Sequence, residues 1–266
     1  MQSLKEKSIS TVHGKTYYWT NEKKECITLV FLPGLTADHT LFEKQTAAFE
    51  DAYNIIVWDC PGHGKSRPYD DFTYPNVTGT LKEILDSEKV DKAVFIGQSL
   101  GGMLAQFFIH NNPGMASGFV SIDSAPFGSY YSKSDFFWLN QLEWMCRMFP
   151  DASLRSAMAK GCGKTEYAQK KMLDMLSDYS KKELCHLIYL GEAAFIPVNE
   201  SINLPCPVVL ILGDCDRLGK VASYNKSWAE KEHYPLHIVE GAAHNSNEDN
   251  PEEVNTIIRD FLKTII

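Results

Sequence analysis

The stretch FIGQSLGGMLAQFFIH, residues 95–110, places one serine between two glycines at the point where an apolar run of strand composition meets an apolar run of helical length. Gly97, Ser99 and Gly101 fit the pattern G-x-S-x-G, in which a serine lies on a sharp turn between a strand and a helix. Side chains two residues before and after that serine would collide, so the turn needs glycine at both positions. A glycine-rich strand end is the alternative interpretation, and the flanking segments distinguish the two.

Short apolar runs rich in valine and isoleucine recur along the chain with little alternation, which is typical of strands buried on both faces of a parallel sheet. They are ITLVFL (27–32), NIIVW (54–58), AVFIG (93–97), GFVSI (118–122), VVLILG (208–213) and LHIVEG (236–241). Helices are predicted at about 40–50, 75–87, 100–111, 222–232 and 251–264. The alternation predicts an open, mostly parallel, twisted α/β sheet flanked by helices. An antiparallel hairpin over 8–20 is expected at its edge.

Residues 126–204 interrupt this alternation, because they contain no convincing core strand. The predicted helices are FFWLNQLEWMCRMF (136–149), ASLRSAMAKG (152–161) and TEYAQKKMLDMLSDY (165–179). We therefore expect a helical cap at 126–204, inserted between two strands of a core formed by 1–125 and 205–266. In open parallel sheets ligands bind outside the carboxyl ends of the strands, so an insertion there could roof the site.

Helix ends within the insertion have recognisable signals. Ser180 and Glu183 fit a capping box that opens a further helix, since the hydroxyl and the carboxylate satisfy free amides of the first turn. Gly161 and Gly191 are expected at helix ends, where glycine is favoured.

The composition is that of an acidic globular protein. The chain has 266 residues, 44% hydrophobic and 23% charged, which fits one or two domains with a substantial core. A net charge of −8 would repel a phosphate backbone, so nucleic acid is not expected as a partner. No apolar stretch is long enough for a membrane span, and residues 1–10 lack the apolar centre of a secretory signal. The seven cysteines form no C-x-x-C pair, which disfavours a zinc site or a disulfide framework and fits a cytoplasmic location.

A serine hydroxyl becomes a nucleophile only with a base, and the base needs an orienting acid. Where G-x-S-x-G forms the turn, the order along the chain is serine, acid, histidine. His244 is the histidine that has both this order and a position just after a strand. Asp216 is the favoured acid, because Asp214 directly follows its strand and is expected to bond the backbone of the turn. Asp123, at the end of another strand, stays a third alternative.

The oxyanion of such a reaction needs preorganised donors. One would be the backbone amide of Leu100, directly after the serine. The second is expected from the loop after the first core strand, where Gly34 allows a turn that points the Leu35 amide inward. Pro33 has no amide to donate. An ordinary Pro-Gly turn is the alternative interpretation of this loop.

Several motifs together resemble the α/β-hydrolase superfamily, in its capped, esterase- and lipase-like Ser-His-Asp branch. They are FLPGLTADHTLFEKQ (31–45), WDCPGHGKS (58–66), GQSLGG (97–102), LGDCDRL (212–218) and GAAHNSNEDNPEEVNTIIRDFL (241–262). The resemblance covers nearly the whole chain and implies a nucleophile elbow, an oxyanion hole, and neither a metal nor an organic cofactor. Many relatives have His-Gly where this chain has Pro33-Gly34. Ser99 argues against the dehalogenase and epoxide hydrolase relatives, which use aspartate there.

The expected function is that of a serine esterase acting on a small or medium, apolar carboxylic ester. Residues 127–149 are rich in aromatic side chains, which either pack in the core or line a pocket. The pocket candidates are Gly34, Trp138, Phe137 and Tyr130. Thioester, lactone or carbon–carbon bond cleavage are variants on the same residues. A lyase, a cofactor-free peroxidase-like enzyme and a ligand-sensing protein with little turnover are the competing interpretations.

Overall fold

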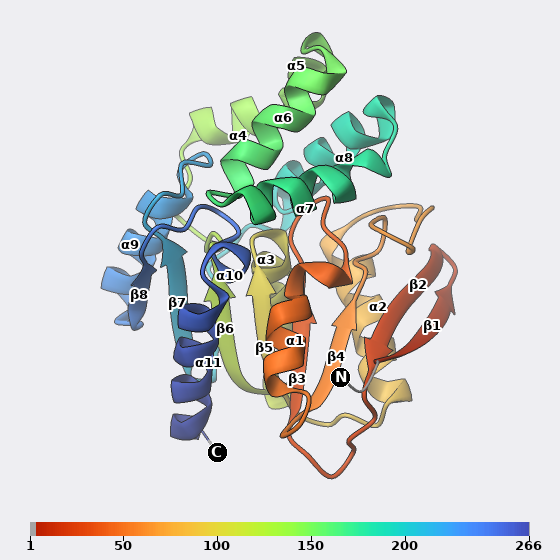
Figure 1. Ribbon diagram of the computed structural model, residues 1–266, viewed down its shortest axis with the longest axis vertical. Coiled ribbons are helices and arrows are strands. Elements are labelled where there is room, and N and C mark those ends of the chain that lie inside the picture. The colour runs from red at the N-terminus through yellow and green to blue at the C-terminus, as the bar shows by residue number, and fades with distance from the viewer. Residues whose placement is uncertain (1–3, 266) are drawn as a thin grey trace.

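One eight-stranded sheet organises the protein, whose computed structural model describes residues 4–265 (Figure 1). The first three residues of the polar 1–10 stretch lie outside the described residues. The strand order is β1-β2-β4-β3-β5-β6-β7-β8. The strands are β1 (Lys5–Thr11), β2 (Gly14–Thr20), β3 (Thr28–Leu32), β4 (Asn54–Trp58), β5 (Ala93–Gln98), β6 (Ala116–Ile122), β7 (Val208–Gly213) and β8 (Leu236–Val239).

The predicted parallel sheet and its edge hairpin are confirmed. β1 and β2 pair antiparallel with each other, β2 pairs antiparallel with β4, and the remaining neighbours are parallel. In the centre, Phe31 of β3 lies opposite Val57 of β4 and Ile96 of β5. The expectation of burial on both faces is wrong for β8, where Ile238 is 46% exposed. β8 forms the edge of the sheet, so no further strand covers it.

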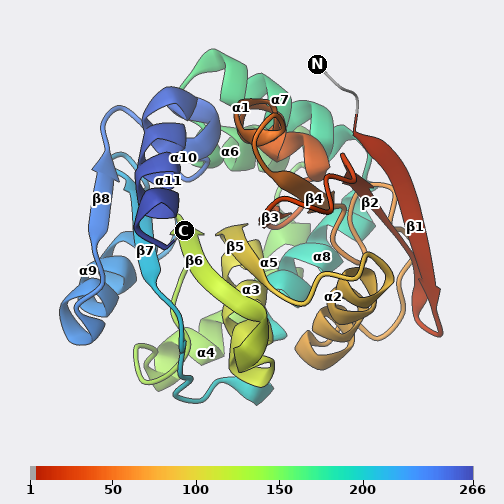
Figure 2. The same ribbon diagram turned by 90° about the horizontal axis from the view of Figure 1, so that it is seen from below.

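Helices cover both faces of the sheet (Figure 2). They are α1 (Glu43–Phe49), α10 (Ser246–Asp249) and α11 (Pro251–Ile265) on one face, and α2 (Tyr74–Ser87), α3 (Leu100–Asn111) and α9 (Val221–Glu232) on the other. Ile258 of α11 packs against the first face, and Leu104 and Phe108 of α3 pack in the core of the second. α3 is buried along nearly its whole length, which explains why its sequence is apolar almost all round.

The 126–204 interval connects β6 to β7 and contains helices that lie together beyond the carboxyl ends of the strands (Figure 1). They are α4 (Lys133–Leu139), α5 (Leu142–Met148), α6 (Asp151–Cys162), α7 (Glu166–Ser177) and α8 (Lys181–Ala193). The single helix predicted over 136–149 is wrong, because α4 ends at Leu139. Asn140 caps it and donates its side-chain amide to the carbonyl of Phe136, an alternative to continuing the helix.

The capping box of Ser180 and Glu183 opens α8 as predicted. Both glycines lie in the last turn of a helix, Gly161 one residue before the end of α6 and Gly191 two residues before the end of α8. Neither is the cap residue, which is Gly163 for α6 and Ala194 for α8. A Cβ at Gly191 would lie 2.3 Å from Cδ1 of Leu35, so this glycine allows close approach and does not end the helix. Among the helices of residues 4–265, none combines the length and the apolar character needed to cross a bilayer.

Candidate active site

Ser99 lies at the junction of β5 and α3 in a strained conformation, with φ 51° and ψ −120°. A Cβ at Gly97 would lie 2.5 Å from the backbone of Gly102, and one at Gly101 would lie 1.8 Å from the carbonyl oxygen of Leu32. Both glycines of the motif are therefore required by contact. The Ser99 amide donates to the carbonyl of Ile122 over 2.9 Å, which fixes the turn to β6.

His244 and Asp216 lie beside the serine in the predicted order. The Nε2 atom of His244 is 2.8 Å from Oγ of Ser99, and its Nδ1 atom is 2.9 Å from Oδ2 of Asp216. The histidine and the aspartate are buried, at 6% and 2% exposure. The other oxygen of Asp216 accepts the amide of Leu218 over 2.8 Å, so the carboxylate is held in place from both sides.

The electrostatics favour a charged imidazole at this position. Burial alone would lower the pKa of His244, but the hydrogen bond with Asp216 and its negative charge outweigh burial and raise that pKa above its ordinary value. The pair therefore stabilises the imidazolium that forms when the histidine takes up a proton.

The two other candidate acids do not contact His244. Asp214 accepts the amide of Ala242 over 3.2 Å, the backbone bond expected of it. Asp123 is fully buried and accepts the amides of Gly213 and Ser246, over 2.7 and 3.0 Å. Burial raises the pKa of the Asp123 carboxyl to about 7. Asp123 thus joins the loop that carries Asp216 to the loop that carries His244.

Two backbone amides near the serine are free to bind an oxyanion. The amides of Leu100 and Leu35 have no hydrogen-bond acceptor among residues 4–265. Leu100 is the first residue of α3, where amides lack a partner within the helix. Gly34 approaches the serine closely, because a Cβ on it would lie 3.0 Å from Cβ of Ser99.

Gln98 has a role that sequence reasoning did not assign. Its side chain is 1% exposed and donates its amide to the carbonyl of His244 over 2.8 Å, and more weakly to Oδ1 of Asn245 over 3.3 Å. Gln98 therefore links the nucleophile turn to the histidine loop. The available signal was an amide side chain at the end of an otherwise apolar buried strand, since a buried amide needs a partner.

A cavity of about 430 Å³ opens onto Ser99 and His244. Its walls are mainly apolar and come from α3, α4, α8 and the start of α9. Of the predicted pocket residues, Trp138 lines this cavity. Tyr130 and Phe137 do not: Tyr130 borders separate surface depressions near α9, and Phe137 is 58% exposed. Gly34 lies beside Ser99 but does not line the cavity wall.

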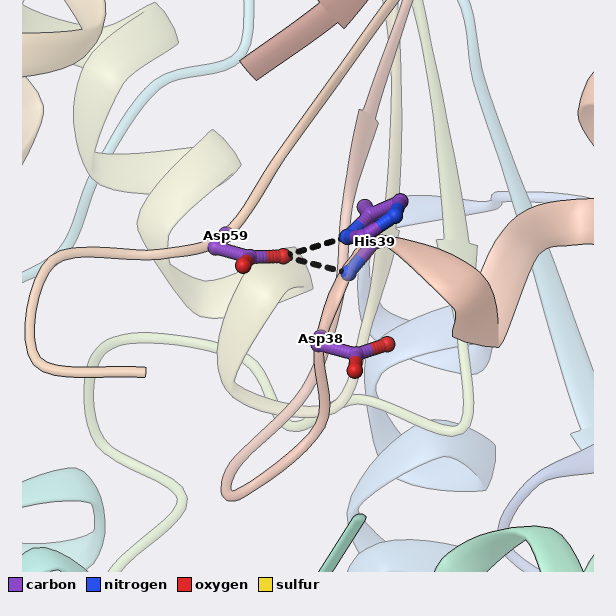
Figure 3. Close-up of side chains that lie close together, drawn as sticks. All are labelled: Asp38, His39 and Asp59. Carbon is purple, nitrogen blue, oxygen red and sulfur yellow. Dashed lines mark hydrogen bonds and ion pairs between the residues drawn. The ribbon is translucent and has the colours of Figure 1, made fainter. Parts of the chain in front are cut away.

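A second polar cluster lies at the carboxyl ends of β3 and β4, formed by Asp38, His39 and Asp59 (Figure 3). Oδ1 of Asp59 accepts both the backbone amide and the Nδ1 proton of His39, and its Oδ2 accepts the amide of Lys65. Asp38 caps the following turn through the amide of Thr40. These hydrogen bonds give the cluster a structural role. They tie the start of the 59–66 loop to His39 and to Lys65.

The loop also contains His63, which is fully buried and bonded through Nδ1 to the carbonyl of Pro61. Burial lowers the pKa of His63 to about 4, so this histidine is neutral at physiological pH. Its ring centroid lies 6.2 Å from that of Phe72, which fits a structural role.

Comparison with known proteins places these residues in a family. A sequence model of the Alpha/beta hydrolase family matches residues 29–257. An uncharacterized hydrolase, YugF of Bacillus subtilis, is 24% identical over 95% of this chain and 96% of its own length. The 3-oxoadipate enol-lactonase 1 of Acinetobacter baylyi is 31% identical, but that match spans only 40% of each chain. A thermophilic esterase of Thermogutta terrifontis superposes with a TM-score of 0.79 at 18% identity, covering 98% of this chain and 99% of its own.

Proposed function

The chain belongs to the α/β-hydrolase family, and we propose that it is a serine hydrolase that cleaves a carboxylic ester through an acyl-enzyme intermediate. The observation that carries this proposal is the continuous hydrogen-bonded line from Ser99 through His244 to Asp216. In that arrangement the histidine can take the hydroxyl proton while the carboxylate orients it and stabilises the resulting cation.

In the proposed reaction, Oγ of Ser99 attacks the ester carbonyl carbon while its proton passes to Nε2 of His244. The negative charge moves to the carbonyl oxygen, where the amides of Leu35 and Leu100 hold it. The tetrahedral intermediate collapses, the bond to the leaving alcohol breaks, and His244 gives that alcohol its proton. Water then attacks the acyl-enzyme with His244 again as the base, which releases the acid and restores Ser99.

The size of the substrate follows from the cavity and from what covers it. A volume of about 430 Å³ suits a small or medium molecule. We assign 126–204 as a cap over the core formed by 1–125 and 205–266, because α8 contributes to the cavity wall opposite the strand ends. A roofed cavity favours such substrates over polymers.

A lactone is the second candidate substrate, because it contains the same ester bond within a ring. The partial similarity to an enol-lactonase of Acinetobacter baylyi favours testing it. The same residues would open the ring, and the acyl and alcohol parts would then leave as one molecule.

Labelling with a fluorophosphonate, followed by intact-mass measurement, tests the nucleophile. We expect one adduct on the wild-type protein and none on Ser99→Ala. An adduct of equal stoichiometry on Ser99→Ala would refute the assignment. A series of p-nitrophenyl esters and lactones of increasing acyl length then tests the substrate class. Turnover below about one per hour on all of them would favour a binding protein.

A further inference from the structure

One acidic side chain in the cavity has no partner. Glu192 of α8 lines the same cavity as Ser99 and His244, on the helix face that also presents Ile188 and Gly191. Its carboxylate makes no hydrogen bond and no ion pair with any residue in the 4–265 range. The side chain is exposed to the solvent of the cavity, and partial desolvation by the protein around the cavity raises the pKa of its carboxyl above the ordinary value.

The other charges around the cavity are already balanced. Lys220 pairs with Asp135 over 2.6 Å, and His244 pairs with Asp216. The deeper carboxyl of Asp123 is occupied by two backbone amides. Glu192 is therefore the acidic group of the cavity wall that these contacts leave without compensation.

The carboxylate of Glu192 places a negative charge in a cavity wall that is otherwise mainly apolar, whereas an apolar residue at this position would continue that wall. A ligand that carries a positive charge would complement it. The cavity suits such a group, because aromatic rings that line it together with Glu192 cluster around Tyr131. Tyr131 lies with its ring centroid 4.9 Å from that of Phe195 and 4.8 Å from that of Tyr224. Aromatic faces attract cations, and quaternary ammonium groups are commonly held in this way.

We propose that Glu192 and the neighbouring aromatic rings form an ammonium-binding subsite, so that the ester substrate of this enzyme carries a cationic amino group. The inference rests on the proposed function, because it names the substrate class of the same cavity. The ammonium group would lie against Tyr131 and Tyr224 with its charge facing Glu192. The remainder of the substrate would extend along the apolar wall toward Ser99.

The test compares two esters of the same shape that differ by one charge. Butyrylcholine and 3,3-dimethylbutyl butyrate differ only in the replacement of the quaternary nitrogen by carbon, and their hydrolysis is followed by pH-stat at pH 8. We expect the wild-type kcat/KM to favour butyrylcholine by about tenfold or more, as desolvated cation recognition allows. Glu192→Gln should bring the ratio close to one. Glu83→Gln, on the exposed outer face of α2, changes the net charge equally and should keep the wild-type ratio.

A binding measurement separates the two proposals. In Ser99→Ala, which leaves Glu192 in place, calorimetry should give tighter binding for butyrylcholine than for its neutral isostere. Adding Glu192→Gln should remove that preference. A wild-type ratio near one, or an unchanged ratio in Glu192→Gln, overturns the ammonium subsite while the esterase stands. Absence of both turnover and fluorophosphonate labelling overturns the proposed esterase activity. In that case the calorimetric preference for butyrylcholine over its neutral isostere alone tests the ammonium-binding subsite.

Discussion

Replacing Gly34 by alanine should damage catalysis through a collision with Gln98. A Cβ at position 34 would lie 2.1 Å from Oε1 of Gln98, whereas ordinary van der Waals contact begins near 3.4 Å. Gln98 cannot simply rotate away, because its side chain is buried and its amide donates to the carbonyl of His244. The added methyl group therefore acts on the histidine loop as well as on the nucleophile turn.

The size of the effect follows from the displacement. One of the two groups must move by about 1.3 Å to relieve a 2.1 Å contact to 3.4 Å. A displacement near 1 Å at reacting groups can cost about 10²-fold in rate. Overpacking of a filled interior adds a loss of about 1–3 kcal/mol in the free energy of unfolding. We expect Gly34→Ala to fold and to lose about 10²-fold in kcat/KM.

The assay is ester hydrolysis by purified variants, with urea unfolding as the measure of stability. Gly79→Ala is the matched control, because a Cβ at Gly79 in α2 meets no atom within 4 Å. It should keep wild-type activity. In a Gln98→Ala background the 2.1 Å contact is absent and the 3.0 Å contact with Cβ of Ser99 remains, so Gly34→Ala should then cost much less than in the wild type. An equal loss in both backgrounds would refute the collision as the cause.

Three further predictions concern titratable groups. Asp216→Asn should lower kcat by about 10⁴-fold, whereas Asp123→Asn should stay within about tenfold of wild type; the reverse order of the two activities would contradict the choice of acid. The base is neutral His244, whose pKa is raised, so kcat/KM should increase with pH and reach half of its maximum above about pH 6.5. A half-maximum below that pH in the pH–rate profile would contradict the raised pKa. His63 has a lowered pKa of about 4, so the unfolded state binds its proton more readily and the free energy of unfolding should fall by about 3 kcal/mol between pH 6.5 and 4. Urea unfolding over that pH range should show a smaller fall in the free energy of unfolding for His63→Asn than for the wild type. An equal fall in both proteins would show that another group causes the pH dependence.

The arrangement of Ser99, Asp216 and His244 could be predicted because it follows from topology. Ser99 comes directly after β5, and Asp216 and His244 lie in the loops that follow β7 and β8. Parallel strands bring their carboxyl ends to one edge of a sheet, so these three residues meet there. Choosing Asp216 over Asp214 needed only the local geometry of one turn. Asp123 was harder to place, because its position after β6 satisfies the same rule. Its carboxylate accepts the backbone amides of Gly213 at the end of β7 and of Ser246 at the start of α10, and no sequence pattern identifies these two as its partners.

Glycines were harder to interpret. Gly97 and Gly101 were predicted correctly because the constraint lies within one motif, where the colliding atoms are close in sequence or belong to the adjoining strand. Gly191 was predicted at a helix end and lies in the last turn of α8, but the contact that requires a glycine there is close approach and not capping. Helix-end glycines and close-approach glycines look alike in sequence. Only the position of Leu35, in a loop more than a hundred residues earlier, distinguishes the two.

Which side chains line the cavity could not be predicted either, because this too depends on the packing of segments far apart in the sequence. The neighbours Phe137 and Trp138 illustrate this. Successive residues of a helix point about 100° apart, so of these two aromatic residues only Trp138 lines the cavity. A high density of aromatic residues indicates a helix that packs or binds, but the direction of each ring depends on how α4 is rotated over the sheet. Glu192 is the clearest case, because a glutamate on an amphipathic helix ordinarily faces bulk solvent. It instead lines the cavity, together with rings from α9 and from the segments flanking α4 and α8, and its carboxylate makes no ion pair with residues 4–265. We infer the substrate from that charge.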